Sequence, residues 1–305
     1  MVNEEPRVPE LPEVETMRRG ILPIVGSRIE SAVRPPCSRR PILLTPRIDT
    51  FNRRLQGKKI VDIGRRGKRV MVEIEDSLTI VIEPRMTGLV LLSDPPTRDH
   101  LRLRIELSGG DNEQLLFWDR RGLGTVRLLS AKEVKSNIDD KLGTDALEIT
   151  ADELRKCLCK SIRAIKVALL DQSDVAGIGN IYAAEILFRS GVDPRTRCNR
   201  LARNQWRRIT TEMHAVLNEA IFYEGSTLSD GTYRNAINGE GSFQAHHSVY
   251  DREGKPCRRC GEGKIRRIVQ TQRSTFFCPV CQRKTGIHRS LLGSWRSTSW
   301  PEAIE

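Results

Sequence analysis

Two pairs of cysteines near the carboxyl end constrain the fold of this chain more than any other feature of its sequence. Cys257 and Cys260 form one CxxC pair, and Cys278 and Cys281 form another after a gap of seventeen residues. This spacing is typical of a zinc site in which two short knuckles supply four thiolates. The segment between them is too short to bury a core, so the metal would supply its folding free energy. The sequence therefore predicts one structural Zn²⁺ ion in a small, basic β-hairpin module.

The net charge of +12 and the pI of about 9.6 indicate a polyanionic partner. Nucleic acid is the leading candidate, and an anionic membrane surface is the alternative. No apolar run approaches the roughly 18 residues of a spanning helix, and the first residues lack the apolar region of a signal peptide. The remaining cysteines are scattered, which favours a reducing compartment over disulfides. We therefore expect a cytoplasmic, monomeric protein that binds nucleic acid and no membrane.

Hydrophobic patterning predicts a change from strands to helices along the chain. Apolar residues recur at helical spacing over residues 12–22. Short β-rich runs follow over residues 60–129, separated by Gly, Asp and Pro, which is typical of a β-sandwich or barrel. Helical periodicity returns after Thr150 and Glu153, which form a capping box. At 305 residues with 38% hydrophobic content, the chain is long enough for more than one domain.

The stretch PELPEVET, residues 9–16, brings a proline and acidic residues together near the amino terminus. A proline at a free amino terminus carries a secondary amine, which can attack an electrophilic carbon and collapse to an iminium adduct. Glu10 beside Pro9 could then serve as an acid or a base. An ordinary helix start explains the same residues, because Pro12 suits a first turn and acids there complement the helix dipole. Both interpretations stay open on spacing alone.

Several turns carry residues suited to DNA binding. Lys68 lies in the basic run RRGKRV, which would attract phosphate even if it were an ordinary hairpin. Met86 in EPRMTG is an apolar residue on a turn, and the alternative to a role in DNA binding is that its side chain folds back onto the core. Gly179 and Asn180 end a glycine-rich turn that runs directly into a helical segment. Backbone N–H groups there can hold an anion, although most such turns merely cap a helix. Arg273, taken alone, is one of several solvated arginines.

Four blocks of sequence, in the same order, resemble bacterial formamidopyrimidine-DNA glycosylases. PELPEVET with the following arginines resembles their opening, and LLDQSDVAGIGNIYAAEILF is similar to their helix-two-turns-helix motif. The β-rich turns and the cysteine module are the other two blocks, so the resemblance spans residues 9–281. It implies an α+β fold: an N-terminal helix plus a two-sheet β-sandwich, a helix-two-turns-helix domain and a four-cysteine zinc finger, with DNA in the cleft between them.

The resemblance also implies domain limits and roles. The limits are residues 9–138 for the catalytic sandwich, 146–235 for the helix-two-turns-helix domain, 246–283 for the zinc finger and 284–305 for a tail. Pro9 would form a Schiff base with the damaged nucleotide, Glu10 would protonate its sugar, and Lys68 and Arg273 would contact phosphate and assist elimination. The DNA-binding residues by resemblance are Met86, His100, Arg121, Leu123, Lys166, Gly179 and Asn180.

Three positions, Leu123, Gly122 and Arg98, depart from the family pattern. The residues Met86, Arg121 and Leu123 correspond to a wedge that enters the duplex where a base is flipped out. Leu123 replaces the usual aromatic residue, Gly122 replaces a second arginine, and Arg98 stands where a histidine is expected. Leucine can intercalate but has no ring to stack, so the departure affects the search for lesions more than catalysis.

We therefore expect a base-excision repair enzyme that removes oxidised purines, namely 8-oxoguanine and formamidopyrimidines, from damaged double-stranded DNA and cleaves the abasic site by β,δ-elimination. One alternative is a non-catalytic damaged-DNA-binding protein on the same scaffold. Another is an endonuclease VIII-like glycosylase for oxidised pyrimidines. Two features favour the purine branch: the opening PELPEVE, and a glycine-rich and polar loop at residues 235–247 that contains GEGSFQ.

The eight residues MVNEEPRV conflict with this mechanism because they make the Pro9 nitrogen an amide. One valine codon, GTG, is a common bacterial start codon. Initiation at Val8 followed by methionine removal would leave Pro9 with a free amine, whose pKa near or somewhat above about 8 leaves a neutral fraction at physiological pH. We therefore expect these residues to be absent from the working enzyme. If they are present, Lys68 is the next candidate nucleophile.

Overall fold

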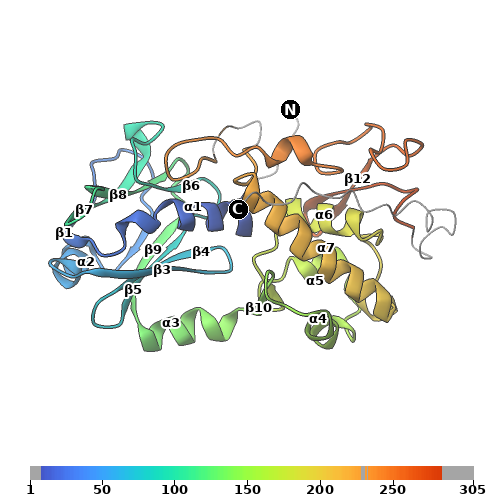
Figure 1. The fold of residues 1–305 in the computed structure, drawn as a ribbon, viewed down its shortest axis with the longest axis horizontal. Helices are drawn as coiled ribbons and strands as arrows, with labels where there is room; N and C mark the ends of the chain where they lie inside the picture. The colour runs from blue at the N-terminus through green and yellow to red at the C-terminus, as the bar shows by residue number, and fades with distance from the viewer. Residues whose placement is uncertain (1–7, 228–230, 232, 284–305) are drawn as a thin grey trace, which may run out of the picture.

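The structure, a computed structural model, describes residues 8–227, 231 and 233–283. The predictions for residues 1–7 and for the tail at 284–305 lie outside the described residues. Figure 1 shows two lobes side by side, a β-rich amino-terminal lobe and a helical lobe that also carries a hairpin from the carboxyl-terminal part of the chain.

Two sheets packed face to face form the amino-terminal lobe, so the predicted sandwich is confirmed. Neighbouring strands are antiparallel except β2 and β9. The first sheet has the order β1 (Arg28–Val33), β7 (Leu101–Ser108), β8 (Gln114–Asp119) and β6 (Gly88–Leu91). The second has the order β2 (Leu43–Thr45), β9 (Thr125–Ser130), β5 (Leu78–Glu83), β4 (Arg69–Ile74) and β3 (Ile60–Arg66).

Continuous apolar runs in β4 and β5 reflect burial on both faces of the second sheet. Val72 and Ile80 lie in the core between the two sheets. On the opposite face, Val81 packs with Ile138, which follows α3 (Ala131–Asn137). A strand covered on both faces has no reason to alternate apolar and polar residues, which is why these segments do not follow a strict period of two.

Helix α1 (Leu11–Gly20) joins the hydrophobic cores of the two lobes. Val14 and Met17 pack in the sandwich core, whereas Leu11 packs in the core of the helical lobe. In Figure 1 the helix runs through the sandwich toward the helical lobe, and its amino-terminal end lies at their junction. The residues at the start of α1 are therefore placed by both lobes.

The helical lobe is built on α7 (Arg203–Phe222), whose buried residues pack against α4 and α6. The predicted capping box is confirmed at the start of α4, where the side chains of Thr150 and Glu153 cap each other's backbone N–H groups. Within the described part of the chain, no helix is both long and apolar enough to cross a bilayer. The other elements of this lobe are α4 (Ala151–Leu158), α5 (Ile165–Leu169), α6 (Asn180–Arg189), β10 (Thr144–Asp145) and β11 (Val175–Ala176).

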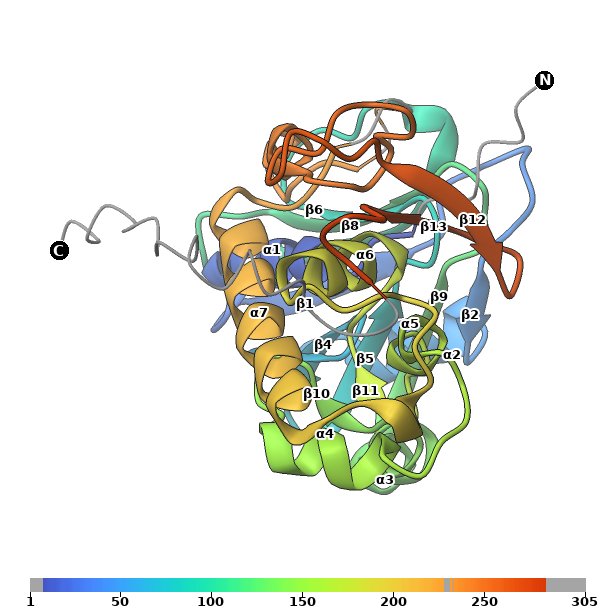
Figure 2. The ribbon, with the colours of Figure 1, turned by 90° about the vertical axis from the view of Figure 1, so that its right-hand side faces the viewer.

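The hairpin β12 (Arg266–Gln270) and β13 (Arg273–Phe277) lies against α6 (Figure 2). Phe276 and Cys278 belong to the core of the helical lobe, so the cysteine module is docked on that lobe. The remaining short elements are α2 (Ile48–Leu55) and the 3₁₀ helices Leu22–Ile24, Arg98–His100, Asp139–Lys141, Cys198–Arg200 and Phe243–His246.

Candidate active site and zinc module

A pocket of about 420 Å³ lies where the two lobes and the β12–β13 hairpin meet. It brings together six of the candidate residues from five separate parts of the sequence. They are Glu10, Lys68, Met86, Gly179, Asn180 and Arg273. Val8 also lines the pocket, and Pro9, which is joined to it, is buried. His100, Arg121, Leu123 and Lys166 do not line this pocket.

The Glu10 carboxylate is held by the start of helix α6. The backbone N–H groups of Gly179 and Ile181 donate to its two oxygens at 2.8 and 2.9 Å, and that of Tyr182 donates at 3.3 Å. Gly179 is required there because a Cβ atom would lie 2.2 Å from Cδ of Glu10. The predicted anion cradle is therefore present, and the anion that it holds is the side chain of Glu10.

The charged groups of the pocket shift one another's protonation. Burial raises the pKa of Glu10, while the Lys68 ammonium and the three N–H groups oppose that rise. Burial likewise lowers the pKa of Lys68, with Glu10 opposing the change and Arg273 adding to it. The two shifts bring the pKa of the carboxyl group and that of the ammonium group closer together, which suits proton transfer in acid–base chemistry.

Arg273 reaches the pocket from a tight turn. Gln270 and Arg273 pair across the hairpin, so Thr271 and Gln272 alone form the turn. Both have positive φ, at 46° and 61°, although neither is a glycine. Such a two-residue turn matches the twist of the strands, and the backbone strain of its non-glycine residues is typical of functional sites.

Glu13 is a functional candidate that sequence reasoning missed. Its carboxylate is fully buried and accepts hydrogen bonds from the Glu10 N–H at 2.9 Å, the Ser226 N–H at 2.8 Å and the Tyr182 hydroxyl at 2.5 Å. Burial and the neighbouring Glu10 raise the pKa of Glu13 to about 7. The signal in the sequence was the acid three residues after Glu10, which completes a capping box.

A buried carboxylate, Asp119, ties together the two turns that carry the expected wedge. It accepts hydrogen bonds from the Thr87 hydroxyl at 2.5 Å, the Arg121 N–H at 3.2 Å and the Gly124 N–H at 2.7 Å. Thr87 follows Met86 directly, so one side chain sets the spacing of both turns. Arg121 itself is exposed, and Met86 and Leu123 are half-buried.

Lys166 has a structural environment that its sequence context did not indicate. Its side chain is buried, and Nζ donates to Asn180 Oδ1 at 2.5 Å, to the Ser274 carbonyl at 2.8 Å and to Thr275 Oγ1 at 2.8 Å. The lysine therefore links the start of α6 to strand β13.

His100 lies edge-on to Trp118, with 5.5 Å between ring centroids.

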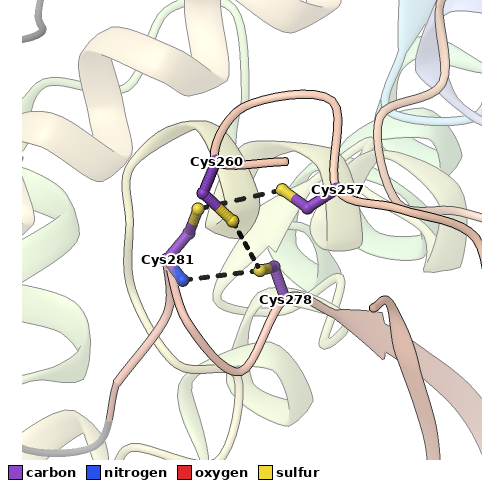
Figure 3. Close-up of side chains that lie close together, drawn as sticks. All are labelled: Cys257, Cys260, Cys278 and Cys281. Carbon is purple, nitrogen blue, oxygen red and sulfur yellow. Dashed lines mark hydrogen bonds between the residues drawn. The ribbon is translucent and has the colours of Figure 1, made fainter. Parts of the chain in front are cut away.

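The four cysteines of the carboxyl-terminal module converge (Figure 3). All four Sγ atoms lie within 4.8 Å of one another, and the Cys257–Cys281 and Cys260–Cys278 pairs are each 3.8 Å apart. Sulfurs about 2.3 Å from a central Zn²⁺ ion in a tetrahedron lie about 3.8 Å from one another. The four thiolates therefore fit one zinc ion.

Three known sequence families match the chain in order. The formamidopyrimidine-DNA glycosylase N-terminal domain matches residues 8–126, the formamidopyrimidine-DNA glycosylase H2TH domain matches 142–232, and a zinc finger found in FPG and IleRS matches 254–283. The chain belongs to the formamidopyrimidine-DNA glycosylase family. The expected resemblance and the predicted zinc site are thereby confirmed, whereas the roles of single residues and the domain limits stay predictions.

Members of the formamidopyrimidine-DNA glycosylase family align over nearly their whole length. The enzyme of Chloroflexus aggregans is 38% identical over 277 residues, covering 90% of this chain and 98% of that protein. The Bacillus subtilis enzyme is 37% identical, covering 91% and 100%. Lactococcus lactis Fpg in complex with DNA containing an abasic site has a TM-score of 0.80 at 33% identity, covering 90% and 100%. The MutM (FPG) protein of Thermus thermophilus has a TM-score of 0.77 at 35% identity, covering 90% and 98%.

Proposed function

We propose that this chain performs the two-step chemistry of its family. It is a DNA glycosylase of base-excision repair that removes oxidised purines, and a lyase that cuts the DNA at the resulting abasic site. The observation that carries this proposal is the buried Glu10 carboxylate, held by helix α6 in one pocket with Lys68 and Arg273. Carboxylate, ammonium and guanidinium groups in one cleft suit proton transfer beside a phosphate backbone.

The nucleophile in this proposal is the nitrogen of Pro9. As a free secondary amine it forms a bond to the anomeric carbon of the damaged nucleotide, and the base leaves with the bonding electron pair and a proton. Glu10 donates a proton to the ring oxygen, the ring opens, and the nitrogen becomes an iminium. Loss of a proton from the adjacent sugar carbon then breaks the 3′ C–O bond and expels one phosphate by β-elimination. Loss of a second proton from the sugar breaks the 5′ C–O bond and expels the other phosphate by δ-elimination.

The place of Pro9 supports this role, and the residues before it must then be absent. Because Val8 lines the pocket, the Pro9 nitrogen bonded to it lies at the same wall as Glu10. With Val8 attached, that nitrogen is an amide and has no basic lone pair. The enzyme that acts therefore begins at Pro9, through initiation at Val8 or removal of residues 1–8.

Damaged double-stranded DNA is the partner in this proposal, and one protein copy acts alone because a single chain supplies every group in the pocket. The net charge of +12 favours the duplex. Met86, Arg121 and Leu123 form the wedge that opens the base stack, and the turn at Gly179 and Asn180 lies beside the flipped nucleotide. The cytosol suits the protein, since its zinc thiolates stay reduced there.

Borohydride trapping tests the function, because it reduces the iminium to a stable protein–DNA adduct. Two forms of the protein are compared on an 8-oxoguanine duplex, one starting at Met1 and one at Pro9. We expect an adduct from the Pro9 form only, and little from the same form on an oxidised-pyrimidine duplex. Glu10→Gln in the Pro9 form should lower the yield at least 100-fold, since general acid catalysis contributes about that factor.

Other outcomes point to specific errors. Equal trapping of a form with an intact Met1 terminus would overturn the assignment of Pro9 and direct attention to Lys68. Binding of lesion DNA by both forms without any adduct would favour the non-catalytic alternative. A larger adduct yield on oxidised pyrimidine would contradict the assignment to purines.

A further inference from the structure

The loop at residues 34–41, between β1 and β2, is an arginine-rich segment fastened to the wedge region. We name it the arginine loop. The Cys37 thiol donates to the Asp99 carbonyl at 3.0 Å, and the buried guanidinium of Arg102 donates to Cys37 Sγ at 2.7 Å. Arg102 also donates to the Asp119 carbonyl at 2.8 Å. The arginine loop is therefore connected to the strand end from which the Arg121 turn departs.

The arginine loop packs closely against the backbone of Gly122. It has a φ of +64°, and a Cβ atom built on it would lie 2.3 Å from the carbonyl oxygen of Arg40. A side chain at position 122 would therefore push the arginine loop away from the turn. This is the position at which the family pattern has a second arginine. In this chain the backbone of Arg40 fills that space instead.

Positive charge accumulates around this contact. Arg39, Arg40, Arg98, Arg120 and Arg121 are all exposed, and among the described residues none of the five forms an ion pair within 4.0 Å. Their guanidinium groups are thus available to an external anion.

Arginines of this cluster also affect the pKa of His100. Burial lowers the pKa of this histidine, and the charges of Arg102, Arg39 and Arg120 lower it further, whereas Asp99 opposes them. Arg39 and Arg120 belong to different loops but act on one imidazole, so the arginine loop and the Arg121 turn present their charges side by side. Asp99 is the carboxylate that opposes them at His100, so positive charge predominates there.

We propose that Arg39 and Arg40 bind backbone phosphates of the DNA duplex next to the wedge, in place of the arginine that the family pattern has at position 122. This inference rests on the proposed function, because it concerns the same bound duplex. In Figure 2 the arginine loop and the tip of the β12–β13 hairpin, which carries Arg273, project toward the same side of the molecule. A duplex that reaches the pocket would thus meet both.

Charge-matched variants test the proposal. Arg39→Gln with Arg40→Gln removes two positive charges from the arginine loop. Lys132→Gln with Lys135→Gln removes two exposed positive charges from α3, which lies at the lower edge of Figure 2, away from the hairpin tip. Binding of both variants to a lesion duplex is measured from low to high salt. Each phosphate contact contributes about 0.9 to the slope of log K against log salt concentration.

We expect the Arg39/Arg40 variant to bind about tenfold more weakly and to lose about 1 to 2 from the salt slope, while the α3 variant stays near wild type. Restoring charge with Arg39→Lys and Arg40→Lys should recover most of the slope, since lysine also binds phosphate as a point charge. An unchanged slope in the Arg39/Arg40 variant, or equal losses in both variants, would overturn the proposal.

Failure of this inference can be told apart from failure of the proposed function. Neither arginine lines the catalytic pocket, so the borohydride adduct at saturating enzyme should form in the Arg39/Arg40 variant as in wild type. If the adduct forms in both and the salt slopes agree, the arginine loop does not bind the duplex although the enzyme is active. If no adduct forms in wild type, the proposed function fails whatever the slopes are.

Discussion

Glu10 and Glu13 are buried carboxylates less than one helical turn apart, and they illustrate what can be predicted at the scale of single residues. Glu10 was identified from its place beside Pro9, and the turn at Gly179 from its pattern as an anion cradle. The hydrogen bonds from this turn to the Glu10 carboxylate could not be predicted, because 169 positions separate Gly179 from Glu10 in the sequence. Glu13 was missed for a similar reason, since its three partners include Tyr182 and Ser226 from distant segments.

Glu13 should make stability depend on pH. Its pKa is about 7 in the folded protein, against an ordinary value of 4.5. Between these values the folded state holds one more proton than the unfolded state, so the free energy of unfolding decreases as pH rises from about 4.5 to about 7. We expect the difference between wild type and Glu13→Gln to decline by up to about 3 kcal/mol over this range, measured by urea unfolding.

The control for this prediction is Glu133→Gln. Glu133 occupies the same capping-box position in α3 but is exposed, and its hydrogen bonds to Ser130 lower its pKa. Its contribution is therefore lost as pH falls, which is the opposite sign. A pH-independent difference for Glu13→Gln would show that Glu13 stays ionised throughout.

At the scale of elements, local patterns predicted most of the fold. The strands of the sandwich, the capping box at Thr150 and the cysteine module all follow from residues close together in the sequence. The arginine loop did not, because it has no regular structure, and its position depends on contacts of Cys37 and Arg40 with residues about 60 to 80 positions away. The role of Asp119 was missed because its side-chain partner Thr87 lies on a separate turn, 32 positions away in the sequence.

The zinc module should be an element that depends on its metal. Replacing Cys260 with serine removes one of four thiolates, so we expect loss of zinc and unfolding of the hairpin that carries Arg273. DNA binding should fall sharply while the sandwich stays folded. Metal analysis, circular dichroism and DNA titration measure these three outcomes. Cys157→Ser, which changes an exposed cysteine outside the cluster, should leave all three unchanged. Active wild-type protein without zinc would contradict the assignment.

At the scale of the whole molecule, Arg65 fastens the two lobes together. Its guanidinium lies 2.6 Å from the Asp145 carboxylate in the helical lobe and 3.1 Å from Glu15 in α1, and all three side chains are at most 15% exposed. Removing one partner of a buried ion pair costs more than the pair itself contributes, because the remaining charge is left without compensation.

We therefore expect Arg65→Ala to lower the free energy of unfolding by about 3 kcal/mol or more. Arg66→Ala is the matched control: its exposed pair with Asp139 at 3.4 Å should contribute at most about 1 kcal/mol. Urea unfolding of both variants measures the difference. Equal losses would indicate that the Arg65 pairs are as solvated as the Arg66 pair and do not hold the lobes.

The attachment of Glu10 to helix α6 also has a consequence during synthesis. A ribosome completes the amino-terminal lobe first, and domains generally fold as they emerge. The proposed nucleophile and Lys68, in the turn between β3 and β4, are then already outside, but the backbone that positions Glu10 has yet to be translated. A nascent or prematurely terminated chain consequently lacks a positioned acid. In the proposed mechanism, strand cleavage therefore requires that translation has passed residue 182 and that the second lobe has folded.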